Sequence, residues 1–264
     1  MLGLGKMGLP MAKHLAARGF EVVGYDPARK KAGHGIRIAA SAREVAQACE
    51  LAIVVVGFDH EVEKALFAPG GVAEGATPGL IVGIASTIAP QYARKLAGRL
   101  KKCGVTLLDM PLARGEQAAV SGKLLVFGGG DAKAFERCRP ALSTFARDIF
   151  HLGPAGAGQV GKMVNNMILW ACVAANDESL RLAEALGVDR DALRKALHRS
   201  SAQNWAMDWR AEDSGMPWAE KDMAIALREA DLARLSLPLS GATREVIKGL
   251  KIRMGLGMPD SGEK

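Results

Sequence analysis

Two groups of residues in this sequence have the types and the spacing that redox chemistry on an alcohol requires. Lys162 lies four residues before Asn166, and on a helix that spacing places both side chains on one face. An amine and a carboxamide can then converge on one substrate oxygen. The chain opens with a glycine-rich turn, Gly3 to Gly8, of the kind that lets a helix N-terminus bind a pyrophosphate. Together they indicate a nicotinamide-dependent dehydrogenase without zinc, and we expect no metal site.

We expect the opening turn to bind the cofactor through Gly3, Leu4, Gly5, Lys6, Met7 and Gly8. A GxGxxG pattern is weak evidence alone, but here a helical stretch follows it, and the next β-rich run ends at Asp26. An acidic residue about twenty positions after the glycines can accept hydrogen bonds from an adenosine ribose. Because the Asp26 carboxylate also repels a 2′-phosphate, we predict NAD rather than NADP, although Arg29 and Lys30 could partly offset that repulsion.

The strand and helix patterns change at Gly153. Before it, β-rich runs alternate with amphipathic stretches, which indicates βαβ units and a Rossmann-type, doubly wound, mostly parallel sheet. The expected strands are Glu21–Tyr25, Leu51–Val56, Leu80–Ile84, Thr106–Asp109, Leu124–Gly128 and Ile149–Leu152. After it, only helical periodicity remains, and the expected helices are Val160–Leu186, Asp189–Leu197, Trp218–Leu235 and Leu239–Lys251. We therefore predict an NAD-binding domain over residues 1–153 and an all-α domain over residues 154–264.

The first strand of the predicted sheet is unusually short. A glycine-rich turn of this type normally follows a buried central strand, yet only Met1 and Leu2 precede Gly3. We expect a stub at that position, or a gap between unpaired strands, in a chain that is truncated or begins at a misplaced start.

Composition excludes several classes of protein. The chain has 264 residues, 49% of them apolar and 24% charged, which is ordinary for a soluble globular protein. We find no membrane-spanning run and no signal peptide. The four cysteines form no CxxC pair, so we expect reduced thiols and a cytoplasmic location. The net charge of +7 lies on polar faces without interleaved aromatic residues, so we predict no nucleic-acid partner.

Five segments occur in the order found in one enzyme family. They are Gly3–Ala12, Ser86–Pro90, Asp109–Pro111, Gly156–Asn166 and Lys221–Asp222. With these segments the chain resembles the β-hydroxyacid dehydrogenases, the family of 3-hydroxyisobutyrate dehydrogenase and tartronate semialdehyde reductase. The resemblance covers nearly the whole chain.

The resemblance implies that Lys162 is the general acid/base and that Asn166 is its partner, both of them in contact with the substrate. Such a residue supplies or removes the alcohol proton as hydride is transferred. A lysine suits this role because burial and a neighbouring cation lower its pKa toward neutrality.

The resemblance also implies cofactor contacts outside the opening turn. Thr87 and the backbone of Val56 and Gly57 correspond to contacts beside the nicotinamide. Lys221 corresponds to a lysine of the helical domain that closes over the cofactor.

The segment expected to bind the substrate departs from the family pattern. Family members commonly carry Asp-x-Pro-x-Ser-Gly-Gly, whose Ser and Gly residues hold the substrate carboxylate, whereas here Ala113, Arg114 and Gly115 follow Pro111-Leu. The arginine resembles the branch that contains sulfolactaldehyde reductase, but the Thr-Ser of that branch is missing. A guanidinium binds planar and tetrahedral oxyanions alike, so carboxylate and sulfonate both fit. Alternatively, Arg114 faces solvent on a turn.

The leading prediction is an enzyme that interconverts a small 3-hydroxy acid, or a related anionic alcohol, and its aldehyde with NAD(H). We expect a homo-oligomer, either a dimer or a tetramer. One alternative is imine reduction on the same scaffold, although that branch typically replaces the catalytic lysine. The other is a catalytically impaired NAD(H)-binding scaffold, which the short first strand favours and which Lys162, Asn166 and Lys221 oppose.

Overall fold

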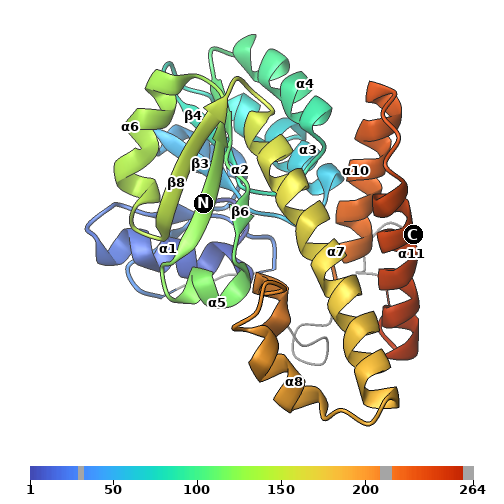
Figure 1. Ribbon diagram of the computed structural model, residues 1–264. Helices are drawn as coiled ribbons and strands as arrows, with labels where there is room; N and C mark the ends of the chain where they lie inside the picture. Colours follow the sequence, from blue (N-terminus) through green and yellow to red (C-terminus); the bar gives the residue numbers. More distant parts are fainter. Residues whose placement is uncertain (29–32, 209–215, 258–264) are drawn as a thin grey trace. The chain divides into compact units, whose positions relative to one another are not determined.

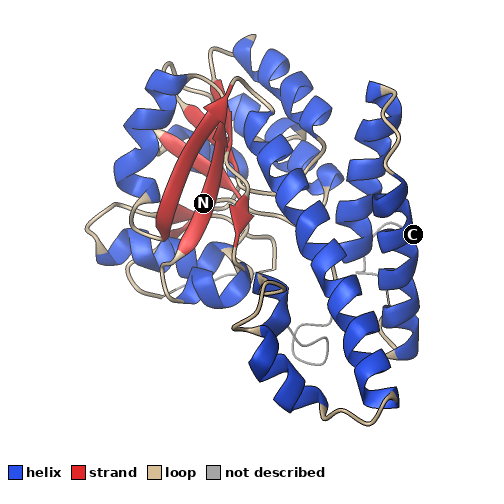
Figure 2. Cartoon of the chain, viewed as in Figure 1, coloured by secondary structure: helices blue, strands red, loops and turns tan. Residues whose placement is uncertain are grey.

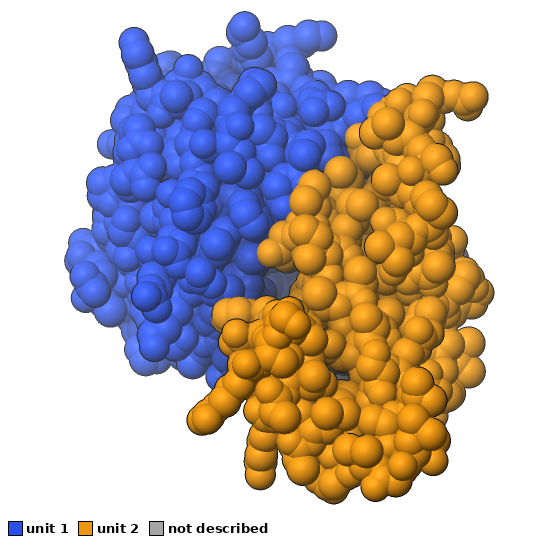
Figure 3. Space-filling view, in the orientation of Figure 1, with its two compact units in different colours: residues 1–162 blue, residues 163–264 orange. Residues whose placement is uncertain are grey.

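The computed structural model describes residues 1–28, 33–208 and 216–257. The chain divides into two compact units, Met1–Lys162 and Met163–Lys264, which are coloured separately in Figure 3. Arg29 and Lys30, which bear on the cofactor prediction, lie outside the described residues.

The first unit alternates strands and helices (Figures 1 and 2). Its strands are β1 (Val23–Gly24), β2 (Arg37–Ile38), β3 (Leu51–Val54), β4 (Ile81–Ile84), β5 (Thr106–Asp109), β6 (Leu112–Ala113), β7 (Leu124–Gly129) and β8 (Ala146–Gly153). Its helices are α1 (Gly8–Ala17), α2 (Ala42–Gln47), α3 (Asp59–Phe67), the 3-10 helix η1 (Val72–Gly75), α4 (Pro90–Lys101), α5 (Gly115–Val120) and α6 (Ala132–Leu142). All the expected strands are present, and the Rossmann-type prediction is confirmed. The two-residue strands β2 and β6 were not expected, because they are too short to show a periodic pattern.

The main sheet is parallel on one side and mixed on the other. Strands β3, β4 and β5 pair in parallel in that order. Strand β7 runs antiparallel to β5 and β6, and β8 pairs with β7 in parallel. The carboxyl ends of β3, β4 and β5 therefore lie at one edge, which is where parallel α/β sheets bind their ligands.

Side chains on the two faces of the sheet pack against different helices. Ile53 and Ile81 belong to a core that also contains residues of α1, α5 and α6. Val54 and Val82, one residue further along each strand, belong to a second core with residues of α2, α3 and α4. This alternation follows from the two-residue period of a strand, and it gives the unit three layers.

The predicted stub is present at the centre of the sheet. Leu2 bridges in parallel to Tyr25 after β1 and to Val54 in β3, and it joins the β1–β2 pair to the larger sheet. The Leu2 amide donates to the Ile53 carbonyl at 2.7 Å, and the Val55 amide donates to the Leu2 carbonyl at 2.8 Å. The Leu2 side chain is buried. A very short segment thus holds the glycine-rich turn between two neighbouring strands.

The second unit is helical throughout its described part. Helix α7 (Ala157–Ala185) begins in the first unit and continues into the second, followed by α8 (Arg190–Leu197), η2 (Trp205–Asp208), α10 (Ala219–Ala233) and α11 (Pro238–Arg253). Buried residues of α7, α10 and α11, including Trp170, Met223 and Ile247, form its core. This confirms the helical C-terminal region. Among the described helices, none has the length and apolar character needed to cross a bilayer.

Candidate active site

The glycine-rich turn is closely packed at Gly3 and Gly8 and open at Gly5. Gly3 has a φ of +90°, and a Cβ there would lie 2.2 Å from the Val55 carbonyl oxygen. A Cβ on Gly8, the first residue of α1, would lie 2.1 Å from the Gly3 carbonyl oxygen. A Cβ on Gly5 would meet no atom within 4 Å. The open space at Gly5, beside an α1 N-terminus that no side chain caps, fits a bound pyrophosphate.

Asp26 holds the glycine-rich turn against the end of β1. Its Oδ2 accepts a hydrogen bond from the Leu4 amide at 2.8 Å, and its Oδ1 accepts one from the Ala28 amide at 2.9 Å. The Leu4 side chain is fully buried in the core, so Leu4 can contribute only backbone atoms to a cofactor site. Each carboxylate oxygen can accept further bonds, so the predicted contact with a ribose is compatible with this geometry.

The two remaining side chains of the turn differ in burial, since Lys6 lies at the surface and Met7 packs against the core. Lys6 is exposed and forms an ion pair with Glu116 of α5 at 3.4 Å, and Met7 precedes α1. An exposed ion pair of this kind contributes little to stability.

The segment after β3 is held by hydrogen bonds to its amides. The Val56 amide donates to the Ser86 hydroxyl at 2.8 Å. The Gly57 and Phe58 amides donate to one Glu61 carboxylate oxygen at 2.8 and 2.9 Å. These bonds fix the backbone that is expected to lie beside the nicotinamide.

A buried carboxylate anchors the start of α7 and was not predicted as a site residue. Asp109, fully buried at the end of β5, accepts hydrogen bonds from the Gly156 amide at 2.7 Å and the Gln159 amide at 2.8 Å. Burial raises the pKa of Asp109 above its ordinary value of 3.8, and these donors offset part of that rise. Helix amides favour a negative charge at this position. Asp109 thereby fixes the helix turn that leads to Lys162.

Lys162 and Asn166 both lie on α7, as their spacing predicts. Lys162 is half-buried and Asn166 is buried. The Asn166 Nδ2 donates to Asp222 Oδ2 at 2.7 Å, and the Trp170 indole donates to the same oxygen at 3.3 Å. The Asn166 Oδ1 accepts a hydrogen bond from the side-chain Nδ2 of Asn165 at 2.9 Å. Asp222 therefore orients the carboxamide, a role that was not predicted.

Lys221 lies in α10, next to Asp222 in the sequence, and its Nζ is 5.4 Å from the centre of the Trp218 ring. That distance allows a cation–π interaction.

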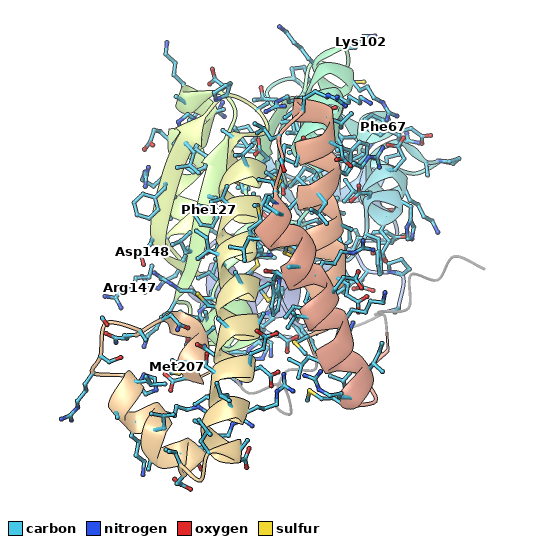
Figure 4. All side chains as sticks on the ribbon, turned by 45° about the vertical axis from the view of Figure 1, so that its right-hand side comes forward. Phe67, Lys102, Phe127, Arg147, Asp148 and Met207 are labelled. Atoms are coloured by element: carbon cyan, nitrogen blue, oxygen red, sulfur yellow. The ribbon has the colours of Figure 1, made fainter. Side chains whose placement is uncertain are left out.

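The Arg114 guanidinium bonds to two protein acceptors, whereas the alternative prediction has it facing solvent. Its Nη1 donates to Asp148 of β8 and to the Lys123 carbonyl. Asp148 is labelled in Figure 4, on the strand beside the one that carries Phe127. Arg114 also has a φ of +84°, in the left-handed region that favours glycine. The neighbouring Ala113 is buried in β6, whereas Gly115 is exposed.

Within the parts of the chain that the structure describes, no three His, Cys, Asp or Glu side chains gather closely enough to hold a metal ion. The titratable residues of the candidate site are instead lysines, an arginine and carboxylates that bond to amides.

Family models match both units of the chain. The model of the NAD binding domain of 6-phosphogluconate dehydrogenase matches residues 1–153. The model described as NAD-binding of NADP-dependent 3-hydroxyisobutyrate dehydrogenase matches residues 156–261. The 3-hydroxyisobutyrate dehydrogenase of Pseudomonas aeruginosa is 34% identical over an alignment of 265 positions, which covers 93% of this chain and 89% of that protein. The chain belongs to the 3-hydroxyisobutyrate dehydrogenase family.

Other curated proteins and solved structures are similar to the chain. The NAD-dependent L-serine dehydrogenase of Pseudomonas aeruginosa is 35% identical over 211 residues, which cover 78% of this chain and 71% of that protein. The structure of Mycobacterium tuberculosis 3-hydroxyisobutyrate dehydrogenase with L-serine superimposes with a TM-score of 0.84 at 28% identity, over 94% of this chain and 91% of that one. The chain is therefore an NAD(P)-dependent oxidoreductase of the 3-hydroxyacid dehydrogenase family.

The Asp109 anchor can be tested by unfolding. At pH 7, Asp109→Asn should lower the free energy of unfolding by about 1–3 kcal/mol, because the new amide group places a donor against helix amides. The variant also removes a carboxyl whose pKa is raised on folding. Such a group stabilises the fold most below pH 3.8, and this contribution is lost as pH rises through the folded pKa. The difference between the proteins should therefore be larger at pH 4 than at pH 7.

Denaturant unfolding at both pH values measures this difference. Asp131→Asn, which alters the carboxylate that caps α6, is a matched control and should change the free energy of unfolding by less than about 1 kcal/mol, because asparagine caps a helix about as well as aspartate. A gap between the unaltered protein and Asp109→Asn that widens as pH rises would contradict the sign derived from burial.

Proposed function

We propose that the protein interconverts a small 3-hydroxy acid and its semialdehyde, with Lys162 as the general acid/base. The observation that carries the proposal is the placement of Lys162 and Asn166 one turn apart on a helix whose start is anchored at the carboxyl end of β5. That edge of a parallel sheet is the usual site of ligand binding. The family relatives act on small hydroxy acids, as their names state.

In this proposal the chain supplies orientation and one proton transfer. A nicotinamide cofactor, held by residues 3–8 and beside Thr87, would supply the hydride chemistry at the substrate carbon. The Lys162 amine takes the hydroxyl proton during oxidation and gives it back to the carbonyl oxygen during reduction. Asn166 keeps one Nδ2 hydrogen on Asp222 and can direct the other to the same substrate oxygen. Lys221 would supply a further cation to the cofactor.

Lys162→Ala tests the proton transfer. Turnover of a semialdehyde should fall by about a hundredfold or more, because the acid that protonates the oxygen is gone. The dissociation constant of NADH should stay within a few fold. Lys101→Ala, at an exposed position of α4, should leave both quantities unchanged. Near-normal turnover in Lys162→Ala would remove the lysine from the mechanism.

We propose NAD as the preferred cofactor. The Asp26 carboxylate ends the segment after β1 and would lie against the 2′-phosphate of NADP if the adenosine binds at the glycine-rich turn. Two phosphate charges beside a carboxylate repel strongly.

The charge of Asp26 can be removed while its acceptor is kept. Asp26→Asn retains an oxygen for the Leu4 amide, and only the exposed hydrogen bond from the Ala28 amide is lost, so the turn should keep its shape. The ratio of kcat/KM for NAD to that for NADP should fall by about tenfold or more. Asp189→Asn, at the start of α8, should leave the ratio unchanged. A preference for NADP in the unaltered protein would overturn the cofactor proposal.

We propose that the substrate anion binds beside residues 113–115, with Arg114 as its cation. Asp148 and the Lys123 carbonyl use Nη1, and a guanidinium has five N–H donors. A carboxylate, or a sulfonate as in the sulfolactaldehyde branch, can be bound by the remaining edge. Asp148 would keep the arginine in place while the anion binds.

Two substitutions separate charge from backbone strain at Arg114. Both Arg114→Ala and Arg114→Gly remove the guanidinium, but glycine also accommodates the φ of +84°. Both should raise KM for an anionic aldehyde by about tenfold or more, with little change for a neutral aldehyde of similar size. Equal effects on the two aldehydes would show that Arg114 supports the loop and does not bind the anion.

A panel of carboxylated, sulfonated and neutral aldehydes with NADH, and of imines, tests the two alternatives. Imine reductases share the fold with this chain at 17% and 20% identity, which supports no shared activity. An inactive scaffold would bind NADH and reduce none of the compounds.

We also propose a cytoplasmic homo-oligomer, a dimer or a tetramer, in which residues 1–153 bind NAD and residues 154–264 form the all-α domain. Light scattering after size exclusion measures the oligomeric state.

A further inference from the structure

The side chain of Gln159 is buried in the first turn of α7 and makes two hydrogen bonds to one loop. Only 1% of the residue is exposed. Its Nε2 donates to the Ser86 carbonyl oxygen at 2.8 Å, and its Oε1 accepts from the Ile88 amide at 3.1 Å. Ser86 and Ile88 are the neighbours of Thr87. One carboxamide therefore bonds to the peptide groups on both sides of Thr87, in the way that a neighbouring strand bonds to a strand residue.

The backbone of Gln159 is fixed as firmly as its side chain. Its amide donates to Asp109 Oδ2 at 2.8 Å, at the end of β5. Lys162 follows three residues later on the same helix, a spacing that makes the two side chains neighbours on the helix surface. Gln159 thus links the loop that carries Thr87 to the helix turn that carries Lys162.

The hydrogen-bond network of Gln159 also includes the segment after β3. Ser86, itself buried, accepts a hydrogen bond from the Val56 amide through its hydroxyl at 2.8 Å. The ends of β3, β4 and β5 are thereby joined through Ser86, Gln159 and Asp109. A buried network in which each member has its partners holds a single geometry.

The two hydrogen bonds that flank Thr87 require the side chain of a glutamine. The side chain must donate to a carbonyl and accept from an amide at the same time, with no charge, in a site without water access. A carboxylate lacks the donor, methionine lacks both functions, and asparagine is one methylene shorter. Since an unpaired buried polar group is costly, any of these replacements should release the loop.

We propose that Gln159 is a positioning residue that sets the place of Thr87, and with it the nicotinamide, relative to the Lys162 amine. This inference rests on the proposed function, in which Thr87 lies beside the nicotinamide. Gln159 touches neither the substrate nor the cofactor; it acts through the two peptide groups that flank Thr87.

Gln159→Met and Gln159→Asn test the inference through binding and hydride transfer. The dissociation constant of NADH should rise by about tenfold in both variants, while that of ADP-ribose, which lacks the nicotinamide, should change less than about twofold. The single-turnover rate of hydride transfer should fall by about a hundredfold, because misplacement by about 1 Å has an effect of that size.

A matched control separates positioning from stability. Leu142→Ala, in the other core of the unit, which does not contain Ile88, should lower the melting temperature but leave the NADH to ADP-ribose ratio and the hydride-transfer rate unchanged. Gln159 variants that lose thermal stability yet keep both of those quantities would overturn the inference. If the unaltered protein binds NADH but reduces no aldehyde, the proposed function fails, and the NADH to ADP-ribose ratio still decides the role of Gln159.

Discussion

A single buried carboxylate determines how helix α7 begins. Asp109 has no exposed surface, and its two oxygens accept the amides of Gly156 and Gln159. A charge in such a place is tolerated only when protein donors replace water. The donors here are at a helix N-terminus, where the backbone dipoles favour a negative charge. The position of α7, and therefore of Lys162, follows from this requirement.

The approach of α7 to the sheet allows no side chain at two positions. A Cβ on Gly158 would lie 2.5 Å from the Phe127 carbonyl oxygen, and one on Gly129 would lie 2.6 Å from Asp109 Oδ1. Two glycines from segments far apart in the sequence therefore permit the amides to reach the carboxylate. The glycines that flank Lys162 are part of this packing and do not serve flexibility.

The sequence indicates the elements of the fold well because they are periodic. The strand Thr106–Asp109 is found with its predicted bounds, and the long helix before Gly187 differs only in its end residues. The glycine-rich turn is also recognisable from the spacing of its glycines, two of which, Gly3 and Gly8, have no room for a side chain. By contrast, the roles of Asp109 and Gln159 depend on partners 50 residues apart, and no local pattern shows such a pairing.

The sequence predicts the relative placement of candidate site residues that lie on one helix. It predicts less well the placement of residues whose position depends on the conformation of a loop. Lys162 and Asn166 required only the helical repeat. Arg114 could be recognised as a cation, but its ion pair with Asp148 connects strands that pair only through β7. Its left-handed backbone is equally invisible in the sequence, since a non-glycine residue there is uncommon.

The separation of these partners along the chain also orders the folding of the first unit. Leu2 finds Tyr25 and Val54 early, so the central strands can pair while synthesis continues, as domains generally fold from the N-terminus. The Asp109 carboxylate cannot be desolvated until Gly156 and Gln159 have left the ribosome, and closing that longer loop adds an entropic cost. We therefore expect the end of β5 to stay hydrated in the nascent chain until residues 156–159 are available to bond to it.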